Sequence, residues 1–392
     1  MKQSDQQWPA SQSRRVAFLL PDMRGGGAER VALQLVRDFL AAGHDVDLVL
    51  MEAKGELLAL VPAPVHVVDL KAARIRSAIT PLIRYLRARR PHALQVSMWP
   101  LTVIGIIAHR LARSKARMVT SDHAALSKHY PAANRAVFQL LVWTIRLFYP
   151  LADARILVSR DAAEDMARFS GMDRSAFQVI YNPIEAPGVV PVATAEVEAL
   201  WPAGGGARII TVGTLKAQKN HALLIRAIAL LNQQRPASLM ILGEGDLRED
   251  LEELAAKLGI SERVMMPGFH TDPWPFYASA QLFVLSSDYE GFGNVLVEAM
   301  YCGLPVVSTD CEAGPREILD GGRFGRLVPC GDVQALADAM LEALGESSSA
   351  NALKGRAEEI SGKATTSNRY LELMIETDPA RDRAQPQQAQ SI

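Results

Sequence analysis

The sequence has few cysteines and no long apolar run. Cys302, Cys311 and Cys330 are the only cysteines among 392 residues, too few and too irregularly spaced for a disulfide framework or a zinc site. Their scarcity indicates a reducing compartment. No run of about 20 apolar residues occurs, so no membrane-spanning helix is predicted; the longest candidate, 93–108, is interrupted by polar residues and a proline. Residues 1–13 lack the apolar core of a signal peptide, and we expect a flexible N-terminus there.

The fingerprint of dinucleotide-binding domains is also missing. A strand predicted at 14–20 is followed by three glycines at 25–27, which permit a tight turn and a close approach of a ligand to the backbone. A nicotinamide dinucleotide would require G-x-G-x-x-G there, with an acidic residue about 20 positions later. The segment GGGAER does not supply this pattern, which argues against classical NAD binding.

The charge is unevenly distributed along the chain. The net charge is −1, yet residues 1–184 hold 25 Lys and Arg against 15 Asp and Glu, and the remaining residues hold 17 against 28. Residues 70–121 contain eleven basic residues and no acidic one. Such a block is not typical of an ordinary solvated face and indicates an anionic partner.

The pattern of elements predicts an α/β fold. Short apolar strands predicted at 14–20, 45–51, 65–70, 93–97, 117–121 and 154–159 alternate with helical segments, and the alternation resumes from 208 onward. Such alternation implies parallel sheets covered by helices, with the active crevice beyond the carboxyl ends of the strands. We therefore expect domains at 14–184 and 208–360, a linker at 185–207, a C-terminal helix at 361–377 that can pack back on the first domain, and a disordered tail at 378–392.

The segment 286–303, SSDYEGFGNVLVEAMYCG, is the most informative stretch. Glu290 is predicted on a loop before a helix that Asn294 caps, and Glu298 lies about one turn inside that helix. Free N–H groups and the helix dipole at this end favour an anion, and two carboxylates suit hydroxyl groups, so a phosphorylated sugar fits both. The alternative is an ordinary strand-to-helix turn with two glutamates spaced by chance.

Five separated motifs give the chain a family resemblance. In order they are GGGAERV (25–31), YNPI (181–184), VGTLKAQKN (212–220), LGEGDLR (242–248) and EGFGNVLVE (290–298). With them the chain resembles glycosyltransferase family 4. GPREIL at 314–319 resembles the subset that builds bacterial surface polysaccharides and lipid-linked oligosaccharides. The resemblance implies the GT-B architecture, in which two Rossmann-like domains face each other across a cleft, and a retaining glycosyltransferase.

The resemblance also implies a donor site in the second domain. Glu298 would accept hydrogen bonds from the ribose hydroxyls of a nucleotide sugar, and Glu290 would contact the transferred sugar. The backbone N–H groups of the turn would meet the diphosphate or the sugar; this turn comprises Gly291, Phe292, Gly293 and Asn294. The alternative for Glu298 is a salt-bridged helix carboxylate.

The resemblance places cations on the donor diphosphate. Lys219 matches a lysine that neutralises charge on the leaving nucleoside diphosphate. Thr214 stands where many relatives have an arginine, so either Lys216 supplies a second cation or the site relies on Lys219 and helix dipoles. Arg316 is a weaker third candidate, and Glu317 is expected to touch the donor sugar.

The first domain would complete the reaction centre. The resemblance implies that Gly26 and Gly27 close over the phosphates and that His123 lies near the reacting sugar; otherwise His123 is a helix-capping or core residue. Retaining enzymes of this type are thought to use same-face attack, so no nucleophile is assigned. No Asp-x-Asp metal motif occurs in a suitable loop, so we expect no metal and no cofactor beyond the nucleotide-sugar substrate.

The basic block belongs to the predicted acceptor domain. Six of its arginines are our candidates for an anionic acceptor or membrane surface: Arg74, Arg76, Arg84, Arg87, Arg89 and Arg90. Each basic residue near an anionic bilayer contributes about 1 kcal/mol. The helix predicted at 132–149 is either an apolar insertion or a core helix of the first domain.

These features predict a cytoplasmic enzyme, peripheral on the inner face of the membrane, that extends a lipid-linked or polysaccharide acceptor. The resemblance of the GPREIL segment to its subset of the family implies a UDP-linked hexose or N-acetylhexosamine as donor in preference to GDP-mannose. The rival predictions are a sugar-nucleotide epimerase or a dehydrogenase, and a nucleic-acid-binding protein that uses the basic block. The block lacks interleaved aromatic residues and a recognition motif, so we expect no nucleic-acid partner.

Overall fold

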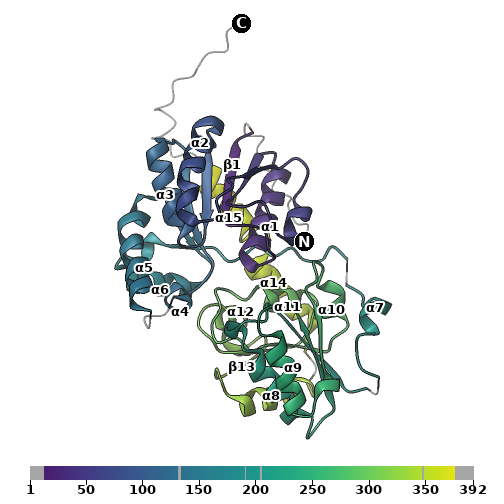
Figure 1. Cartoon of the computed structure of the whole chain (residues 1–392). Coiled ribbons are helices and arrows are strands. Elements are labelled where there is room, and N and C mark those ends of the chain that lie inside the picture. Colours follow the sequence, from purple (N-terminus) through teal and green to yellow (C-terminus); the bar gives the residue numbers. More distant parts are fainter. Residues whose placement is uncertain (1–12, 131–133, 190, 204, 347, 376–392) are drawn as a thin grey trace.

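The computed structural model describes residues 13–130, 134–189, 191–203, 205–346 and 348–375. It consists of two α/β domains, one above the other in Figure 1, each built on its own parallel sheet. The predicted architecture of two Rossmann-like domains that face each other is confirmed.

The N-terminal domain contains a seven-stranded sheet in the order β3-β2-β1-β4-β5-β6-β7. Its strands are β1 (Arg15–Leu20), β2 (Asp45–Leu50), β3 (His66–Asp69), β4 (Ala93–Ser97), β5 (Arg117–Asp122), β6 (Ala154–Leu157) and β7 (Gln178–Val179). Its helices are α1 (Gly27–Ala41), α2 (Ile79–Arg89), α3 (Leu101–Ala112), α4 (Leu126–His129), α5 (Arg135–Phe148) and α6 (Arg160–Ser170). Short 3-10 helices are η1 (Glu56–Leu60), η2 (Ile75–Ala78), η3 (Tyr149–Leu151) and η4 (Arg174–Ala176). Helices cover both faces of the sheet, which explains why its inner strands are nearly continuous apolar runs.

The C-terminal domain contains a six-stranded sheet in the order β10-β9-β8-β11-β12-β13. Its strands are β8 (Ala207–Val212), β9 (Ala237–Leu242), β10 (Val264–Gly268), β11 (Leu282–Leu285), β12 (Val306–Thr309) and β13 (Arg326–Val328). Its helices are α8 (His221–Leu231), α9 (Arg248–Lys257), α10 (Trp274–Ala278), α11 (Asn294–Tyr301), α12 (Pro315–Ile318), α13 (Val333–Ala343) and α14 (Ala350–Ser361), with η5 (Ala217–Lys219), η6 (Ser261–Arg263) and η7 (Asp320–Gly322) between them. The strand order reverses between β8 and β11, as it does between β1 and β4, and ligands of such sheets bind at this switch point.

The chain crosses between the domains twice. The first crossing, 185–207, contains α7 (Ala195–Glu198) and is anchored by Trp201, whose Nε1 donates to Ser279 Oγ at 2.9 Å. After α14 the chain returns to the N-terminal domain as α15 (Ser367–Ile375), the yellow helix that lies among the purple and blue elements of Figure 1. There Tyr370 is fully buried in the core of β1 and α1, and Ser367 Oγ donates to Asp38 Oδ2 at 2.6 Å. The tail predicted at 378–392 and the N-terminus predicted at 1–13 lie almost wholly outside the described residues.

One predicted helix cap is wrong. Helix α11 begins after Gly293, and Asn294 is its first residue rather than its cap. None of the helices in the described part of the chain combines the length and the apolar character that a bilayer crossing requires.

Candidate donor and acceptor site

A cavity of about 610 Å³ lies between the two domains. It is lined from both sides by turns that follow the strands, at the carboxyl ends of both sheets. The N-terminal domain contributes the turns after β1, β4 and β5, and the C-terminal domain contributes those after β8, β9, β10 and β11. The crevice predicted from the element pattern is therefore present.

A buried ion pair joins two of the predicted residues. Lys219 Nζ lies 2.6 Å from Glu290 Oε1, and the two side chains are 15% and 7% exposed. Ser287 Oγ donates to the same carboxylate oxygen at 2.6 Å. Glu290 is thus fixed in direction, and Lys219 is held beside it at the cavity wall. One carboxylate oxygen is used by both donors, which leaves Oε2 for a ligand hydroxyl.

Glu298 is oriented by a different partner. Its Oε2 accepts a hydrogen bond of 2.8 Å from the buried hydroxyl of Tyr277. Burial, followed by the charge of Glu298, raises the pKa of Tyr277, which keeps the phenol a donor. No described basic side chain lies within ion-pair distance of Glu298, so the salt-bridge alternative is wrong for the described chain. Its carboxylate lines the cavity.

The turn between the two glutamates depends on glycine twice. Gly293, the N-cap of α11, has φ 106°, a left-handed conformation that L side chains rarely adopt. A Cβ on Gly291 would lie 1.8 Å from the carbonyl oxygen of His123. Gly291 therefore permits the two domains to touch at this point, and Phe292 lies stacked on Tyr181 with ring centroids 5.3 Å apart.

Asn294 has a role that the sequence did not reveal. Its Oδ1 accepts from Asn182 Nδ2 at 2.7 Å, and its own Nδ2 lies 3.4 Å from the carbonyl oxygen of Gly27. Because this side chain is engaged by the N-terminal domain, it does not cap α11. Asn182, from the YNPI motif, was not predicted as a site residue; its place in a recurring motif was the available signal.

The cations differ in position. Lys216 and Thr214 line the cavity with Lys219, and Lys216 has no ion-pair partner among the described residues. Burial, followed by the charge of Lys219, lowers the pKa of Lys216. Arg316 is 61% exposed, pairs with Asp310 and is absent from the cavity lining. The geometry therefore favours Lys216 as the second cation over Arg316.

Glu317 does not face the cavity, which corrects its predicted contact with the donor sugar. Its carboxylate accepts from the backbone N–H groups of Arg160 and Asp161 at 2.8 and 3.2 Å and from the Tyr181 hydroxyl at 2.9 Å. The two N–H groups belong to the first turn of α6, where a negative charge is favoured. Glu317 thus links the C-terminal domain to the N-terminal one.

His123 lies at the cavity, directly after β5. Its Nε2 is 3.1 Å from Ser121 Oγ, and burial lowers the pKa of the ring to about 4, an effect that Asn182 partly opposes. The imidazole is therefore neutral near pH 7. It does not cap α4, whose N-cap is Ala125. The preceding Asp122, not predicted as a site residue, also lines the cavity, and burial raises its pKa to about 6.

The glycine turn of the N-terminal domain packs against the other domain. A Cβ on Gly25 would lie 3.0 Å from the Phe269 ring, and a Cβ on Gly26 would lie 2.4 Å from Glu29 Oε2. Gly26 and Gly27 line the cavity, and Glu29 lines it beside them. The closure of the two glycines over the phosphates stays a prediction. Burial raises the pKa of Glu29. Glu29 was not predicted as a site residue, although its place in the GGGAERV motif was an available signal.

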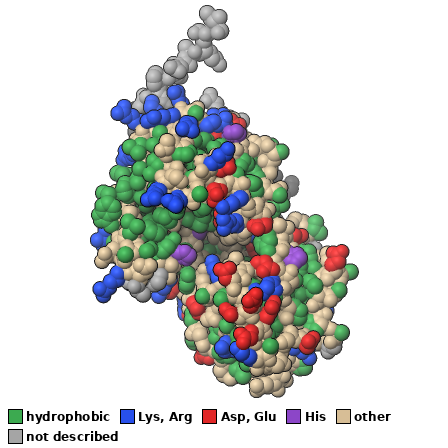
Figure 2. All heavy atoms as spheres, in the orientation of Figure 1, with side chains coloured by type: hydrophobic (Ala, Val, Ile, Leu, Met, Phe, Trp, Pro, Cys, Tyr) green, Lys and Arg blue, Asp and Glu red, His purple; other side chains and the backbone are tan. Residues whose placement is uncertain are grey.

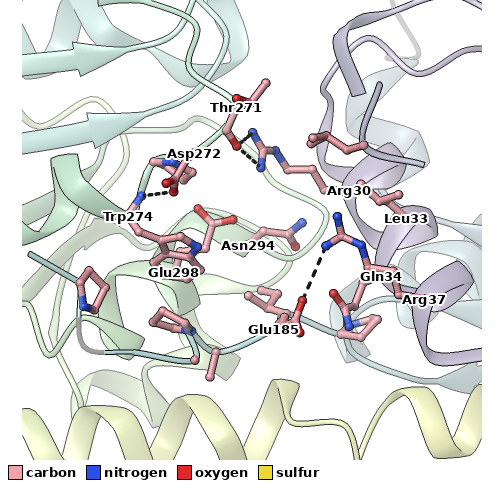
Figure 3. A pocket seen from close by; sticks show the side chains of 18 of the residues that line it. Arg30, Leu33, Gln34, Arg37, Glu185, Thr271, Asp272, Trp274, Asn294 and Glu298 are labelled. Atoms are coloured by element: carbon pink, nitrogen blue, oxygen red, sulfur yellow. Dashed lines mark hydrogen bonds and ion pairs between the residues drawn. The ribbon is translucent and has the colours of Figure 1, made fainter. Parts of the chain in front are cut away.

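A second cavity, of about 630 Å³, is also lined by Glu298 and Asn294 (Figure 3). Arg30 reaches across it from α1 to the carbonyl oxygen of Thr271 at 3.4 Å. Arg37, also on α1, lies 3.7 Å from the carboxylate of Glu185. The first contact joins the two domains, and the second joins α1 to the crossing segment 185–207.

The basic block is only partly free. Arg89 pairs with Asp47 at 2.8 Å, and since Asp47 is 1% exposed, Arg89 neutralises a buried carboxylate rather than a partner molecule. Arg87 Nη2 donates to the carbonyl oxygen of Leu111 at 3.0 Å, and Arg90 Nε lies 3.4 Å from the Arg87 carbonyl oxygen. The three remaining candidates have no ion-pair partner among the described residues: Arg74, Arg76 and Arg84. In Figure 2, Lys and Arg are prominent on the upper domain, whereas Asp and Glu gather on the lower one.

Helix α5 has features of both predicted alternatives. Leu141 and Ile145 are fully buried in the core of the N-terminal domain. On its outer face Trp143, Leu140 and Leu147 are 62%, 52% and 49% exposed. Exposed apolar side chains that cluster on one helix are typical of an interaction surface. Among the described residues, no group of three or more His, Cys, Asp or Glu side chains that could hold a metal is present.

Two family descriptions match the chain, one in each domain. "Glycosyltransferase Family 4" matches residues 25–186, and "Glycosyl transferases group 1" matches residues 197–360. A Campylobacter jejuni protein, N-acetylgalactosamine-N,N'-diacetylbacillosaminyl-diphospho-undecaprenol 4-alpha-N-acetylgalactosaminyltransferase, is 30% identical over 80% of this chain and 86% of its own length. The chain belongs to glycosyltransferase family 4. It is a glycosyltransferase with the GT-B fold.

Other comparisons agree with this membership. A second Campylobacter jejuni protein, GalNAc-alpha-(1->4)-GalNAc-alpha-(1->3)-diNAcBac-PP-undecaprenol alpha-1,4-N-acetyl-D-galactosaminyltransferase, is 26% identical over 82% of this chain and 87% of its own length. The crystal structure of HepE from Anabaena in complex with UDP and glucose superposes with a TM-score of 0.77 at 21% identity, and the match covers 93% of this chain and 100% of that chain. At this identity the structural match supports the fold of the glycosyltransferase alone.

Proposed function

We propose that this glycosyltransferase moves a hexose or N-acetylhexosamine from a UDP-linked donor to a lipid-linked or polysaccharide acceptor in bacterial cell-envelope glycan synthesis, with retention of anomeric configuration. The observation that carries the proposal is the cavity that brings Lys219, Lys216, Glu290 and Glu298 together between the domains. Two cations beside two carboxylates suit a diphosphate flanked by hydroxyl-rich groups.

The orientation of each carboxylate supports a division of labour. Glu298 lies in α11 and accepts a hydrogen bond from Tyr277, and it is our candidate for the ribose hydroxyls. Glu290, which pairs with Lys219, is our candidate for the transferred sugar. The backbone N–H groups at the start of α11 suit the diphosphate. The two lysines supply the charge neutralisation, so we propose that transfer needs no metal.

The ion pair at Glu290 also bears on the mechanism. Lys219 and Ser287 both bind Glu290 Oε1, and a carboxylate stabilised in this way is a poor nucleophile. We therefore propose same-face attack, in which an oxygen of the leaving diphosphate receives the proton of the acceptor hydroxyl. His123, neutral near pH 7, would contribute a hydrogen bond near the reacting sugar rather than a charge.

The two Campylobacter relatives support a lipid-linked acceptor, because both of their names include undecaprenol carrying a diphosphate-linked glycan. The free arginines of the basic block and the outer face of α5 support binding to an anionic membrane surface. We propose that the enzyme works on the cytoplasmic face of the membrane, where nucleotide sugars are available.

A donor panel tests this function. Purified protein is heated with UDP-glucose, UDP-galactose, the two UDP-N-acetylhexosamines and GDP-mannose, because a ligand of the native state raises the unfolding temperature with its occupancy. We expect a UDP-sugar to give the largest shift, and transfer of that sugar to a lipid extract to proceed in excess EDTA. Proton NMR of the product should show the donor's own anomeric configuration. An inverted product, or a shift with GDP-mannose alone, would contradict the proposal.

Vesicle flotation tests the membrane location separately. Recovery should be higher with anionic vesicles than with neutral ones and should fall as salt is raised. Arg84→Ala should reduce it without changing donor binding. Equal recovery with anionic and neutral vesicles, at both low and high salt, would show that the basic block does not bind membranes.

A further inference from the structure

An apolar groove lies on the N-terminal domain, apart from the interdomain cavity. It has a volume of about 570 Å³ and is formed by η2, the turn between β4 and α3, one face of α3 and the outer face of α5. Hydrophobic side chains dominate the left-hand side of the upper domain in Figure 2, where α3 and α5 lie in Figure 1.

The walls of this groove are apolar and remain open. Its lining includes Ile104 and Ile107 of α3 and Leu140 and Trp143 of α5. Leu140 is 52% exposed and Trp143 is 62% exposed. A soluble domain rarely leaves large apolar side chains beside an unfilled groove unless a ligand or a partner covers them.

Trp99 is the wall that this groove shares with the interdomain cavity. The residue lines both spaces. Its Nε1 donates to Thr144 Oγ1 of α5 at 3.0 Å, and its backbone N–H donates to Asp122 Oδ1 at 3.0 Å. Tyr130, which also lines the interdomain cavity, packs edge-on against the Trp99 ring at 4.7 Å. The indole is therefore fixed between the groove and the candidate reaction centre.

Two unpaired cations line the same groove. Arg74 and Arg76 flank Ile75 of η2, and both are exposed. Neither has an ion-pair partner among the described residues, in contrast to Arg89. Guanidinium groups bind phosphate oxygens in pairs of parallel hydrogen bonds. An apolar groove with two free arginines, next to a polar cavity, suits an amphiphile in which a diphosphate joins a hydrocarbon chain to a glycan.

We propose that this groove binds the hydrocarbon chain of the acceptor lipid itself, that Arg74 and Arg76 bind its diphosphate, and that Trp99 separates the chain from the glycan at the reaction centre. The proposal rests on the proposed function, because it requires a lipid-linked acceptor. General membrane attachment would leave this surface facing the bilayer without a specific ligand. The proposal instead assigns the groove to one ligand, the acceptor lipid.

Direct binding tests the groove without transfer. Calorimetry of the full chain, with saturating UDP to occupy the donor site and no vesicles present, compares dimethylallyl, geranyl and farnesyl diphosphate. Each buried methylene strengthens binding by up to roughly fourfold, so we expect at least about a tenfold lower Kd for farnesyl than for dimethylallyl diphosphate. A Kd that does not depend on chain length would overturn the proposal.

Matched variants assign the binding to the groove. Trp143→Ala should remove most of the dependence on chain length. Leu147→Ala is the control, since Leu147 is also exposed on α5 (49%) but does not line the groove. Arg74→Ala and Arg76→Ala should weaken all three ligands by the same factor, about three- to tenfold. Equal effects of Trp143→Ala and Leu147→Ala would also contradict the proposal.

The remaining outcomes separate this proposal from the function on which it rests. If Trp143→Ala reduces flotation on vesicles but leaves the binding of farnesyl diphosphate unchanged, the groove faces the bilayer and the proposal is wrong. If farnesyl diphosphate binds as expected but no lipid-linked glycan accepts a sugar, the proposed function fails and the binding site stands. If a water-soluble glycan is glycosylated and the chain length of the ligand has no effect, the groove proposal alone fails.

Discussion

The two domains share one architecture and differ in what they offer at the cavity. The C-terminal domain provides the ion pair of Lys219 and Glu290, the oriented Glu298 and the start of α11. The N-terminal domain provides a glycine turn, a neutral His123 and an outer face with exposed apolar side chains and free arginines. Similar folds thus differ through the side chains placed after their strands, which accords with the general separation of function from fold.

The largest effect should come from the C-terminal side of this comparison. Lys219→Ala removes the cation that we propose to lie beside the leaving group and leaves Glu290 buried without its charge partner. We expect kcat to fall about 10²- to 10³-fold, measured at saturating donor, with circular dichroism to verify folding. Lys216→Ala, at a lysine with no ion-pair partner in the described chain, should cost about tenfold. Equal losses would contradict the assignment of Lys219 as the principal cation.

The two domains contact each other where Gly291 lies against the carbonyl oxygen of His123, and a single substitution can disrupt this contact. Gly291→Ala would place a Cβ 1.8 Å from the His123 carbonyl oxygen, so the domains must separate. We expect kcat/KM to fall about 10- to 100-fold, as overpacking of this kind costs about 1–3 kcal/mol, and small-angle scattering to show a larger radius of gyration. Gly355→Ala is the control, because nothing lies within 4 Å of a Cβ there. An unchanged radius would show that closure does not depend on this contact.

The basic block divides into structural and free arginines, which can be told apart by stability. Arg89→Ala leaves the buried Asp47 without its charge partner, with only the Tyr85 hydroxyl, among the described residues, as a side-chain donor at 2.8 Å. We expect a cost of about 2 kcal/mol, below the value for a fully buried pair because Arg89 is 35% exposed. Arg84→Ala should change the free energy of unfolding by less than about 0.5 kcal/mol. Denaturant unfolding of both variants measures the difference. Similar values would remove the distinction between the two classes of arginine.

The N-terminal side of the cavity should respond to pH through His123. The pKa of the native ring is lowered to about 4, so between about pH 6.5 and about pH 4 the unfolded state binds more protons. The stability that neutral His123 contributes is therefore complete above pH 6.5 and is lost as the pH falls. When the pH falls from 7 to 5, the free energy of unfolding should decrease by about 1–2 kcal/mol less in His123→Gln than in the parent protein. The raised pKa of Asp122 has the opposite effect on the pH dependence of stability. Because Asp122 is present in both proteins, its contribution cancels when the two curves are compared. Parallel curves would show that His123 is not buried as described.

Much of the fold was predictable because it depends on local patterns. The strand predicted at 14–20 is β1, Arg15–Leu20, since a short buried run between a polar segment and a glycine turn permits few alternatives. The position of Glu298 inside α11 was predicted for the same reason. The motifs Gly26-Gly27 and Glu290–Glu298 do meet at one cavity, because both follow strand ends at the switch points of their sheets.

What could not be predicted depends on contacts between distant residues. Asn294 was expected to cap α11, but Asn182, 112 positions away, engages its side chain. Glu317 was expected at the donor sugar, but it binds the start of α6 in the other domain, 157 positions away. Arg89 was counted as a free cation, but Asp47, 42 positions away, neutralises it. In each case a polar side chain had an equally good local interpretation, and only tertiary packing, within the N-terminal domain for Arg89 and between the domains for Asn294 and Glu317, selected its partner.

Direct binding to two matched variants tests the central claim that the C-terminal domain holds the nucleotide through Glu298 and the sugar through Glu290. Calorimetry compares UDP with the preferred UDP-sugar on Glu298→Gln and Glu290→Gln. We expect Glu298→Gln to weaken both ligands by the same factor, about 10- to 100-fold, and Glu290→Gln to leave UDP unchanged while it weakens the UDP-sugar and lowers turnover. Weaker UDP binding by Glu290→Gln together with unchanged UDP binding by Glu298→Gln would contradict this division of the site.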